Sequence, residues 1–240
     1  MKTLLYTTLT LFASFAAYCQ PSVKADLTLA EVTAKINGNP KVQVLDARSA
    51  EEFAQNHLPG AINVDLTNPD HQAILDHLDK SQPTFTYAIG GGRSGQLAAQ
   101  LLTNHFAEVH VIPGGIANWI GSGNPIVNHT KAGVAISSES YQALSHSDPL
   151  VLVDFGSKFC PGCRRLAPVI DSLESAKISQ LKIVRIEAYD NPDLGQQLGI
   201  QAWPTLVLYN SGKEVWRNTG FIESGALQNA IESRRLLVAK

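Results

Sequence analysis

The first half of the chain alternates short apolar runs with amphipathic segments. The apolar runs predict strands at 42–45, 84–88 and 109–112. The amphipathic segments between them predict helices at 28–36, just after Arg48, at 71–79 and at 96–104. Thr28 and Glu31 form a capping-box pattern at the start of the first helix. Strands that alternate with helices predict an α/β domain with a parallel sheet and helices on both faces.

The second half repeats the alternation in a different order. Apolar runs predict strands at 150–155, 181–186, 205–209 and 214–217. Helices are expected at 138–145, 164–174, 191–198 and 223–236. The segment 124–137 has no strong pattern and contains Pro125 and Gly133, so we interpret it as the boundary between two domains at 24–127 and 135–240.

Residues 1–19 have a different pattern from the rest. Lys2 is followed by an apolar stretch from Leu4 to Ala17 that is too short for a membrane span, which is typical of a secretory signal peptide. Such a signal would direct export of the protein to the periplasm or the exterior, with cleavage after Cys19. The alternative is a lipid anchor on Cys19, which the bulky Tyr18 before it disfavours, and only this alternative brings the protein to a membrane.

The composition limits the classes of protein and of binding partner that we expect. The 240 residues are long enough for two cores, and 44% hydrophobic with 17% charged residues describes folded domains. The formal net charge of −2 provides no basic surface, so nucleic acid is not an expected partner.

Two of the three cysteines form the motif Cys160-Pro-Gly-Cys163, between the apolar run 150–155 and a predicted helix. A helix N-terminus favours thiolate over thiol, so Cys160 is the candidate nucleophile and Cys163 the candidate resolving thiol. Arg164 and Arg165 add positive charge. The alternatives are a structural disulfide or half of a zinc site, but no second pair of ligands follows, so we expect neither a metal nor a cofactor.

Several motifs in the first half resemble the rhodanese family across roughly its whole domain length. They are Asp46-Ala-Arg48, Glu52-Phe53, His57-Leu-Pro-Gly-Ala61, Gly90-Gly-Gly-Arg-Ser94 and Pro113-Gly-Gly-Ile-Ala-Asn-Trp119. In active members a cysteine opens the glycine-rich loop and carries sulfur as a persulfide. The matching position here is Ala88, so the resemblance implies a domain without sulfurtransferase activity.

The loop that remains has two interpretations. Gly91, Arg93 and Ser94 could form an anion-binding concavity before a helix. Alternatively, the glycines make only a tight turn and Arg93 pairs with an acidic neighbour, which is the interpretation we favour. Arg48 is also expected to be structural, tying loops together through carboxylates such as Asp46.

The second half resembles the thioredoxin family over about a hundred residues. The resemblance implies a mixed sheet with flanking helices, a buried proton-shuttling acid at Asp154 and a nearby basic residue at Arg185. It also implies a proline within the active-site helix at Pro168. A cis-proline loop at Trp203-Pro204 and a glycine at Gly220 would border the substrate groove.

Trp203 departs from the family pattern, which has a smaller residue before the cis proline. The family also has an aromatic residue where this chain has Gly156. We therefore consider two possibilities for Trp203: it fills the space vacated at Gly156 and covers the sulfur, or it is a packed core residue.

Together these features predict an exported thiol–disulfide oxidoreductase that acts on protein thiols or disulfides, and possible partners include a membrane or periplasmic redox protein. Cys160 would attack, Cys163 would resolve and Asp154 would move the proton. The direction of electron flow stays open. Two rival functions also remain: a partner- or anion-binding module built on the Ala88 loop, and an accessory that presents sulfur species to Cys160.

Overall fold

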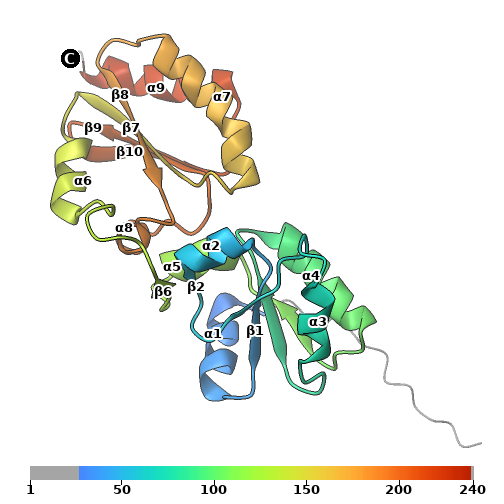
Figure 1. Ribbon diagram of the computed structural model, residues 1–240. Helices are drawn as coiled ribbons and strands as arrows, with labels where there is room; N and C mark the ends of the chain where they lie inside the picture. Colours follow the sequence, from blue (N-terminus) through green and yellow to red (C-terminus); the bar gives the residue numbers. More distant parts are fainter. Residues whose placement is uncertain (1–26, 239–240) are drawn as a thin grey trace, which may run out of the picture.

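The first domain is built on four short parallel strands, of which the two central ones are almost entirely buried. The computed structural model describes residues 27–238, and Figure 1 shows this domain as the blue-to-green half of the chain. Its strands are β1 (Gln43–Asp46), β3 (Ile62–Asn63), β4 (Thr84–Tyr87) and β5 (Val109–Val111), in the order β3-β1-β4-β5. Every pair in this sheet is parallel, as the alternating pattern predicts.

Both faces of this sheet are covered by helices. On one face, Leu97 and Leu101 of α4 (Gly91–Thr103) and Leu75 of α3 (His71–Asp76) pack with Leu45. On the other face, α1 (Leu29–Gly38) and α5 (Gly115–Gly121) contribute to a second apolar cluster. The expected capping box at Thr28 begins α1, and α2 (Ala50–Gln55) begins at a second one formed by Ser49 and Glu52.

The second domain has a mixed sheet, as expected. Its strands are β7 (Leu150–Gly156), β8 (Leu181–Glu187), β9 (Thr205–Asn210) and β10 (Lys213–Thr219), in the order β10-β9-β7-β8. β7 and β8 are parallel, whereas β9 is antiparallel to both β7 and β10. Leu152 and Leu208 face one side of the sheet, and Val151, Val153 and Tyr209 face the other. Because both faces are buried, the central strands are apolar at nearly every position.

Four helices cover these two faces. α7 (Pro161–Ser175) and α9 (Ser224–Val238) pack against the leucine side through residues such as Ile170 and Leu227. Figure 1 shows both helices along the same side of the sheet. α6 (Ser138–Ser145) and α8 (Pro192–Gln197) cover the opposite side through Tyr141 and Leu194.

The structure corrects three expectations about elements. The glycine-rich segment is not a turn before α4, because the helix begins at Gly91 and Gly90 is its N-cap residue. α5 was not predicted; its first residues include Gly115, which has a positive φ of +61°. The boundary segment is not without structure, since β6 (Val127–Asn128) pairs antiparallel with β2 (Asn56–His57).

The two domains contact each other closely. Figure 1 places α5 of the first domain beside α8 of the second. At this contact a Cβ on Gly121 would overlap the carbonyl oxygen of Ile200, so only glycine permits the approach. The apolar cluster around Tyr87 and Trp119 of the first domain also continues into Tyr189 and Cys160 of the second.

Two predictions from the N-terminus lie outside the described residues: the signal peptide at 1–19 and the possible lipid anchor at Cys19. Within 27–238, no helix is both long enough and apolar enough to span a membrane.

Candidate functional site

The Cys160–Cys163 motif lies at the start of α7, after the buried strand β7 and a short loop. Cys160 is the N-cap residue, with extended φ and ψ of −78° and 119°, and Pro161 follows at the first helical turn. The backbone N–H of Cys163 donates to Cys160 Sγ at 3.2 Å. The two cysteines are joined by a disulfide. In the reduced form, the same N–H and the helix dipole favour a thiolate at Cys160.

Asp154 lies behind the disulfide, near the end of β7. Its Oδ1 is buried and is the one buried side-chain oxygen or nitrogen among the described residues without a hydrogen-bond partner. Burial raises the pKa of Asp154 from 3.8 to about 6, while the charge of Arg185 opposes that rise. A carboxyl group with this pKa can accept or supply a proton near neutral pH.

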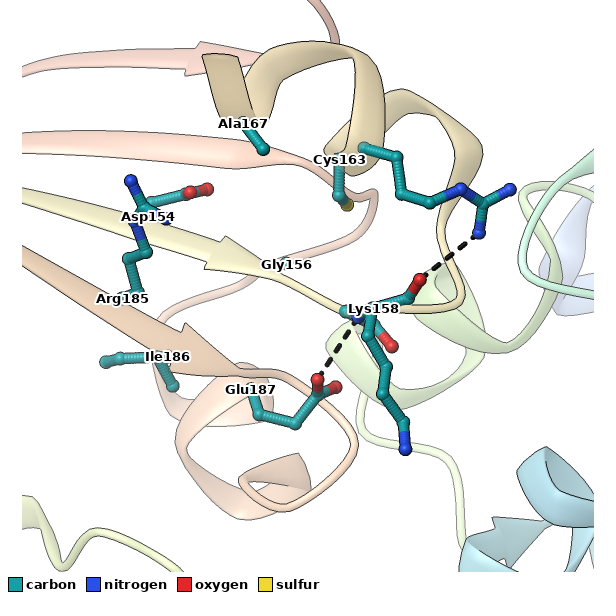
Figure 2. A pocket seen from close by; sticks show the side chains of 10 residues that line it. Asp154, Gly156, Lys158, Cys163, Ala167, Arg185, Ile186 and Glu187 are labelled. Atoms are coloured by element: carbon teal, nitrogen blue, oxygen red, sulfur yellow. Dashed lines mark hydrogen bonds between the residues drawn. The ribbon is translucent and has the colours of Figure 1, made fainter. Parts of the chain in front are cut away.

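A cavity of about 420 Å³ connects Asp154 with Cys163. Figure 2 shows both side chains on its wall, with Gly156 between them. A Cβ built at Gly156 would lie 3.2 Å from Cys163 Sγ and 3.7 Å from Asp154 Oδ1, so the two atoms border the same small space. The space between them allows a proton to pass between the resolving cysteine and the acid through a bridging water molecule.

Arg185 is adjacent to Asp154 in the β7–β8 register, as expected for the basic residue near the acid. Its guanidinium group, however, donates to Asp171 at 2.6 Å and to Glu174 at 3.2 Å on α7. Arg185 therefore acts on Asp154 through its charge only. Pro168 lies inside α7, at the place that the sequence predicts.

The Trp203-Pro204 bond is cis and places the loop beside the redox motif. The Trp203 carbonyl oxygen lies 3.4 Å from Cys160 Sγ. The backbone N–H of Gly220 donates to the Pro204 carbonyl at 2.8 Å, which holds the predicted loop residues together. A Cβ on Gly162 would lie 3.1 Å from Pro204 Cδ, so the loop and the helix start fit closely.

The proposed filling of the space at Gly156 by Trp203 is wrong. The atoms nearest to a Cβ at Gly156 belong to Cys163 and Asp154. The indole ring instead meets Tyr189 edge to face, with 4.9 Å between ring centroids. Trp203 is thus packed into the apolar cluster shared by the two domains.

The glycine-rich segment that follows Ala88 is held in place by hydrogen bonds. Ala88 is buried at the end of β4, and Ser94 Oγ donates to the Gly90 carbonyl at 3.1 Å. Arg93 makes two hydrogen bonds to Glu52, at 2.6 and 2.9 Å. Burial disfavours the charged form of Glu52, but Arg93 outweighs it and holds the pKa of Glu52 below its usual range. The prediction that Arg93 pairs with an acidic neighbour is confirmed.

The loop and the redox motif face the same cavity. A space of about 870 Å³ is bordered by Ala88, Gly91 and Arg93 of the first domain and by Cys160 and Trp203 of the second. Residues that the sequence singled out separately are therefore brought to one place. Cys163 and Asp154 line the smaller cavity instead, and the buried Ser94 lines neither cavity.

Hydrogen bonds also cross the domain boundary, and one of them involves Glu52, which lines this cavity. Tyr189 donates its hydroxyl to Glu52 at 3.0 Å, and its carbonyl accepts from Asn56 Nδ2 at 2.9 Å. The Arg48 guanidinium lies 5.1 Å from the centre of the Tyr189 ring. Gln55 adds a bond of 2.7 Å to Asp190. We refer to Arg48, Glu52, Asn56, Arg93 and Tyr189 as the boundary network.

Sequence reasoning missed one residue of the boundary network and one residue of the site. Tyr189 gave no motif signal, because its role depends on a contact with the other domain. Glu187 lines the Asp154 cavity, and burial raises its pKa. Its position at the end of β8, parallel to the end of β7, was the available signal. Figure 2 shows its carboxylate accepting from the backbone N–H of Lys158, at 3.3 Å.

These features define a two-domain α/β protein with a cysteine pair suited to thiol–disulfide exchange. Comparison with known proteins agrees. The family model for Thioredoxin matches residues 133–233, and the model for Rhodanese-like domain matches residues 28–122. The expected order of the two domains is confirmed.

Individual known proteins resemble the second domain. Thioredoxin from Porphyra purpurea is 33% identical over 90 residues, covering 38% of this chain and 84% of that protein. Thioredoxin from Chlamydia caviae is 36% identical over 92 residues, covering 38% and 88%. The solved structure of Plasmodium falciparum thioredoxin has a TM-score of 0.37 at 21% identity, covering 42% of this chain and 94% of that one. The chain belongs to the thioredoxin family and is a thiol–disulfide oxidoreductase that carries a rhodanese-like domain.

Proposed function

We propose that Cys160 is the attacking thiol of this oxidoreductase, Cys163 the resolving thiol and Asp154 the group that exchanges a proton with Cys163. The arrangement that carries the proposal is the cavity in which an unpartnered buried carboxyl faces the second cysteine of a helix-capping pair. Protein thiols or disulfides are the substrates, consistent with the thioredoxin relatives. Trp203, Pro204 and Gly220 are assigned to the substrate-contacting loop.

The chemistry is tested by dithiol-dependent reduction of insulin. Cys160→Ala should abolish turnover, because Cys160 is the one cysteine among the residues that line the cavity between the domains. Asp154→Asn should slow the step in which Cys163 resolves the mixed disulfide, most strongly between pH 6 and 7. Measuring the reduction potential of the Cys160–Cys163 pair against glutathione buffers then decides whether the protein acts as an oxidant or a reductant.

The rhodanese-like domain is assigned an accessory role without sulfurtransferase activity of its own. Ala88 cannot form a persulfide. The shared cavity favours one second candidate, in which the domain helps to handle sulfur species at Cys160. Thiocyanate formation from thiosulfate and cyanide distinguishes the two candidates. Activity that is present in the wild type and disappears in Cys160→Ala would support the handling of sulfur species, whereas no activity in the wild type would support a purely accessory role.

Export is the remaining part of the proposal, and it rests on the pattern of residues 1–19. Expression of the full chain followed by cell fractionation and mass spectrometry of the mature N-terminus tests it. A mature chain that begins at Gln20 supports export and cleavage, whereas a lipid-modified Cys19 supports anchoring and an intact Met1 contradicts both.

A further inference from the structure

The position of the first domain limits what can reach Cys160. Although Cys160 borders the 870 Å³ cavity, only 2% of the residue is exposed. Phe159 and Trp203, which line the cavity together with Cys160, pack into the cluster that contains Leu58 and Tyr87 of the first domain. The surface on which an extended peptide could pair with the cis-proline loop is thus covered by the protein's own first domain.

The cavity that remains suits a small molecule. Its volume falls within the range of about 300–1,000 Å³ that is usual for small-ligand pockets. Apart from the adjoining backbone, no atom lies within 4 Å of the position that a Cβ would take on Gly90, Gly91 or Gly92, so open space reaches the backbone at the start of α4. A folded protein cannot enter such a space, but a disulfide of a few residues can.

We propose that the inter-domain cavity is a binding site for low-molecular-weight disulfides, and that the rhodanese-like domain excludes folded protein substrates unless the domains separate. This inference rests on the proposed function, because it uses Cys160 as the attacking thiol. Protein disulfides are then substrates of the separated arrangement. The boundary network and the Gly121–Ile200 contact hold the domains together and determine the choice of substrate.

The reaction in the cavity is balanced as two exchanges. The Cys160 thiolate attacks one sulfur of the small disulfide, whose S–S bond breaks and releases one thiol after protonation. Cys163 transfers its proton to Asp154 and attacks Cys160 Sγ, which releases the second thiol with that proton. The protein pair loses two electrons, the small disulfide gains them, and an external dithiol restores the reduced pair.

The test compares two substrates in single turnovers of the pre-reduced full chain: glutathione disulfide as the small probe and insulin as the protein probe. The wild-type protein should react faster with glutathione disulfide than with insulin. Gly121→Val places a side chain against the Ile200 backbone and forces α5 and α8 apart. This variant should increase the insulin rate and leave the glutathione disulfide rate within about twofold, because only the protein substrate depends on the open population.

A second variant keeps the proposal testable if Gly121→Val fails to fold. Gln55→Ala combined with Tyr189→Phe removes two hydrogen bonds across the boundary and keeps the aromatic packing. Loss of two such bonds should raise the insulin rate about tenfold. Gly38→Ala, at a helical site with open space, is the matched control and should change neither rate.

The outcomes distinguish failure of the size selection from failure of the proposed oxidoreductase function. Equal wild-type rates for both substrates, or an insulin rate that neither variant raises, overturns the size selection and leaves the oxidoreductase function intact. A wild-type protein that reacts with neither substrate refutes the proposed function itself. A higher insulin rate with an unchanged small-disulfide rate, and an expanded shape by small-angle scattering, supports the inference.

Discussion

Replacing Asp154 with asparagine should stabilise the second domain, and the gain should depend on pH. The wild-type carboxyl group is buried without a partner for Oδ1, so folding disfavours its ionised form. Burial raises its pKa from 3.8 to about 6, against the charge of Arg185. Glu174, whose charge raises this pKa, and Glu187, on the cavity wall, add negative charge nearby.

The sign and size follow from proton linkage. Below pH 4 both the folded and the unfolded states carry the proton, so the carboxyl group costs nothing. Between pH 4 and 6 the unfolded state loses the proton first, so the free energy of unfolding falls, and above the folded-state pKa the loss is constant. A pKa difference between 3.8 and about 6, at about 1.4 kcal/mol per unit, corresponds to about 3 kcal/mol at pH 8.

The assay is hydrogen exchange of the oxidised full chain at increasing urea, at pH 4.5 and pH 8. Peptides from β7 and β9 report the free energy of unfolding of the second domain, and peptides from β1 and β4 are an internal control. Asp154→Asn should gain about 2 kcal/mol more at pH 8 than at pH 4.5, because the unfolded-state carboxyl group is already largely ionised at pH 4.5. Asp171→Asn, at an exposed carboxylate paired with Arg185, is the matched variant and should show no gain.

A constant difference in the free energy of unfolding between variant and wild type at both pH values would contradict the raised pKa of Asp154. It would mean that Asp154 titrates alike in the folded and unfolded states. The amide of asparagine also lacks partners at this site, but that cost is independent of pH and cancels in the comparison.

Three other changes test separate parts of the structure. Arg48→Lys loses the paired hydrogen bonds to buried Asp46 and should lower the stability of the first domain by about 3 kcal/mol in urea denaturation; an unchanged midpoint would contradict a structural role. Gly115→Ala forces an alanine to adopt a positive φ and pushes its Cβ into the Ala88 carbonyl oxygen, so thermal unfolding should show that the free energy of unfolding falls by at least about 1–3 kcal/mol. Cys163→Ala should accumulate mixed disulfides on non-reducing gels, whereas their absence would argue against its resolving role.

Much of each domain could be predicted from the sequence, because the periodicity of hydrophobic residues and the local motifs indicate where helices and strands form. The apolar run 150–155 and the capping box at Thr28 predict their elements directly. Asp154 and the cis bond before Pro204 were expected from the thioredoxin resemblance and occupy the expected places. The pairing of Arg93 with an acid was also predicted, although its partner Glu52 was not.

The relation between the domains could not be predicted. Tyr189 lies in a loop with no motif, and its partners Glu52 and Asn56 are more than a hundred residues away in the chain. Gly121 has an ordinary φ, so only the nearby Ile200 carbonyl explains why glycine is needed. Such contacts depend on tertiary geometry, which hydrophobic period does not encode.

The buried contact between Arg48 and Tyr189 affects how this protein can be divided. Although two family models match its halves separately, the core cluster around Tyr87 includes Tyr189 and Cys160 from the other half. Cutting the chain in the boundary segment would leave Tyr189 and Trp203 uncovered on one fragment and Leu58 and Trp119 on the other. The structural unit is therefore the pair of domains together, in which a substitution at Arg48 or Tyr189 alters the packing of both at once.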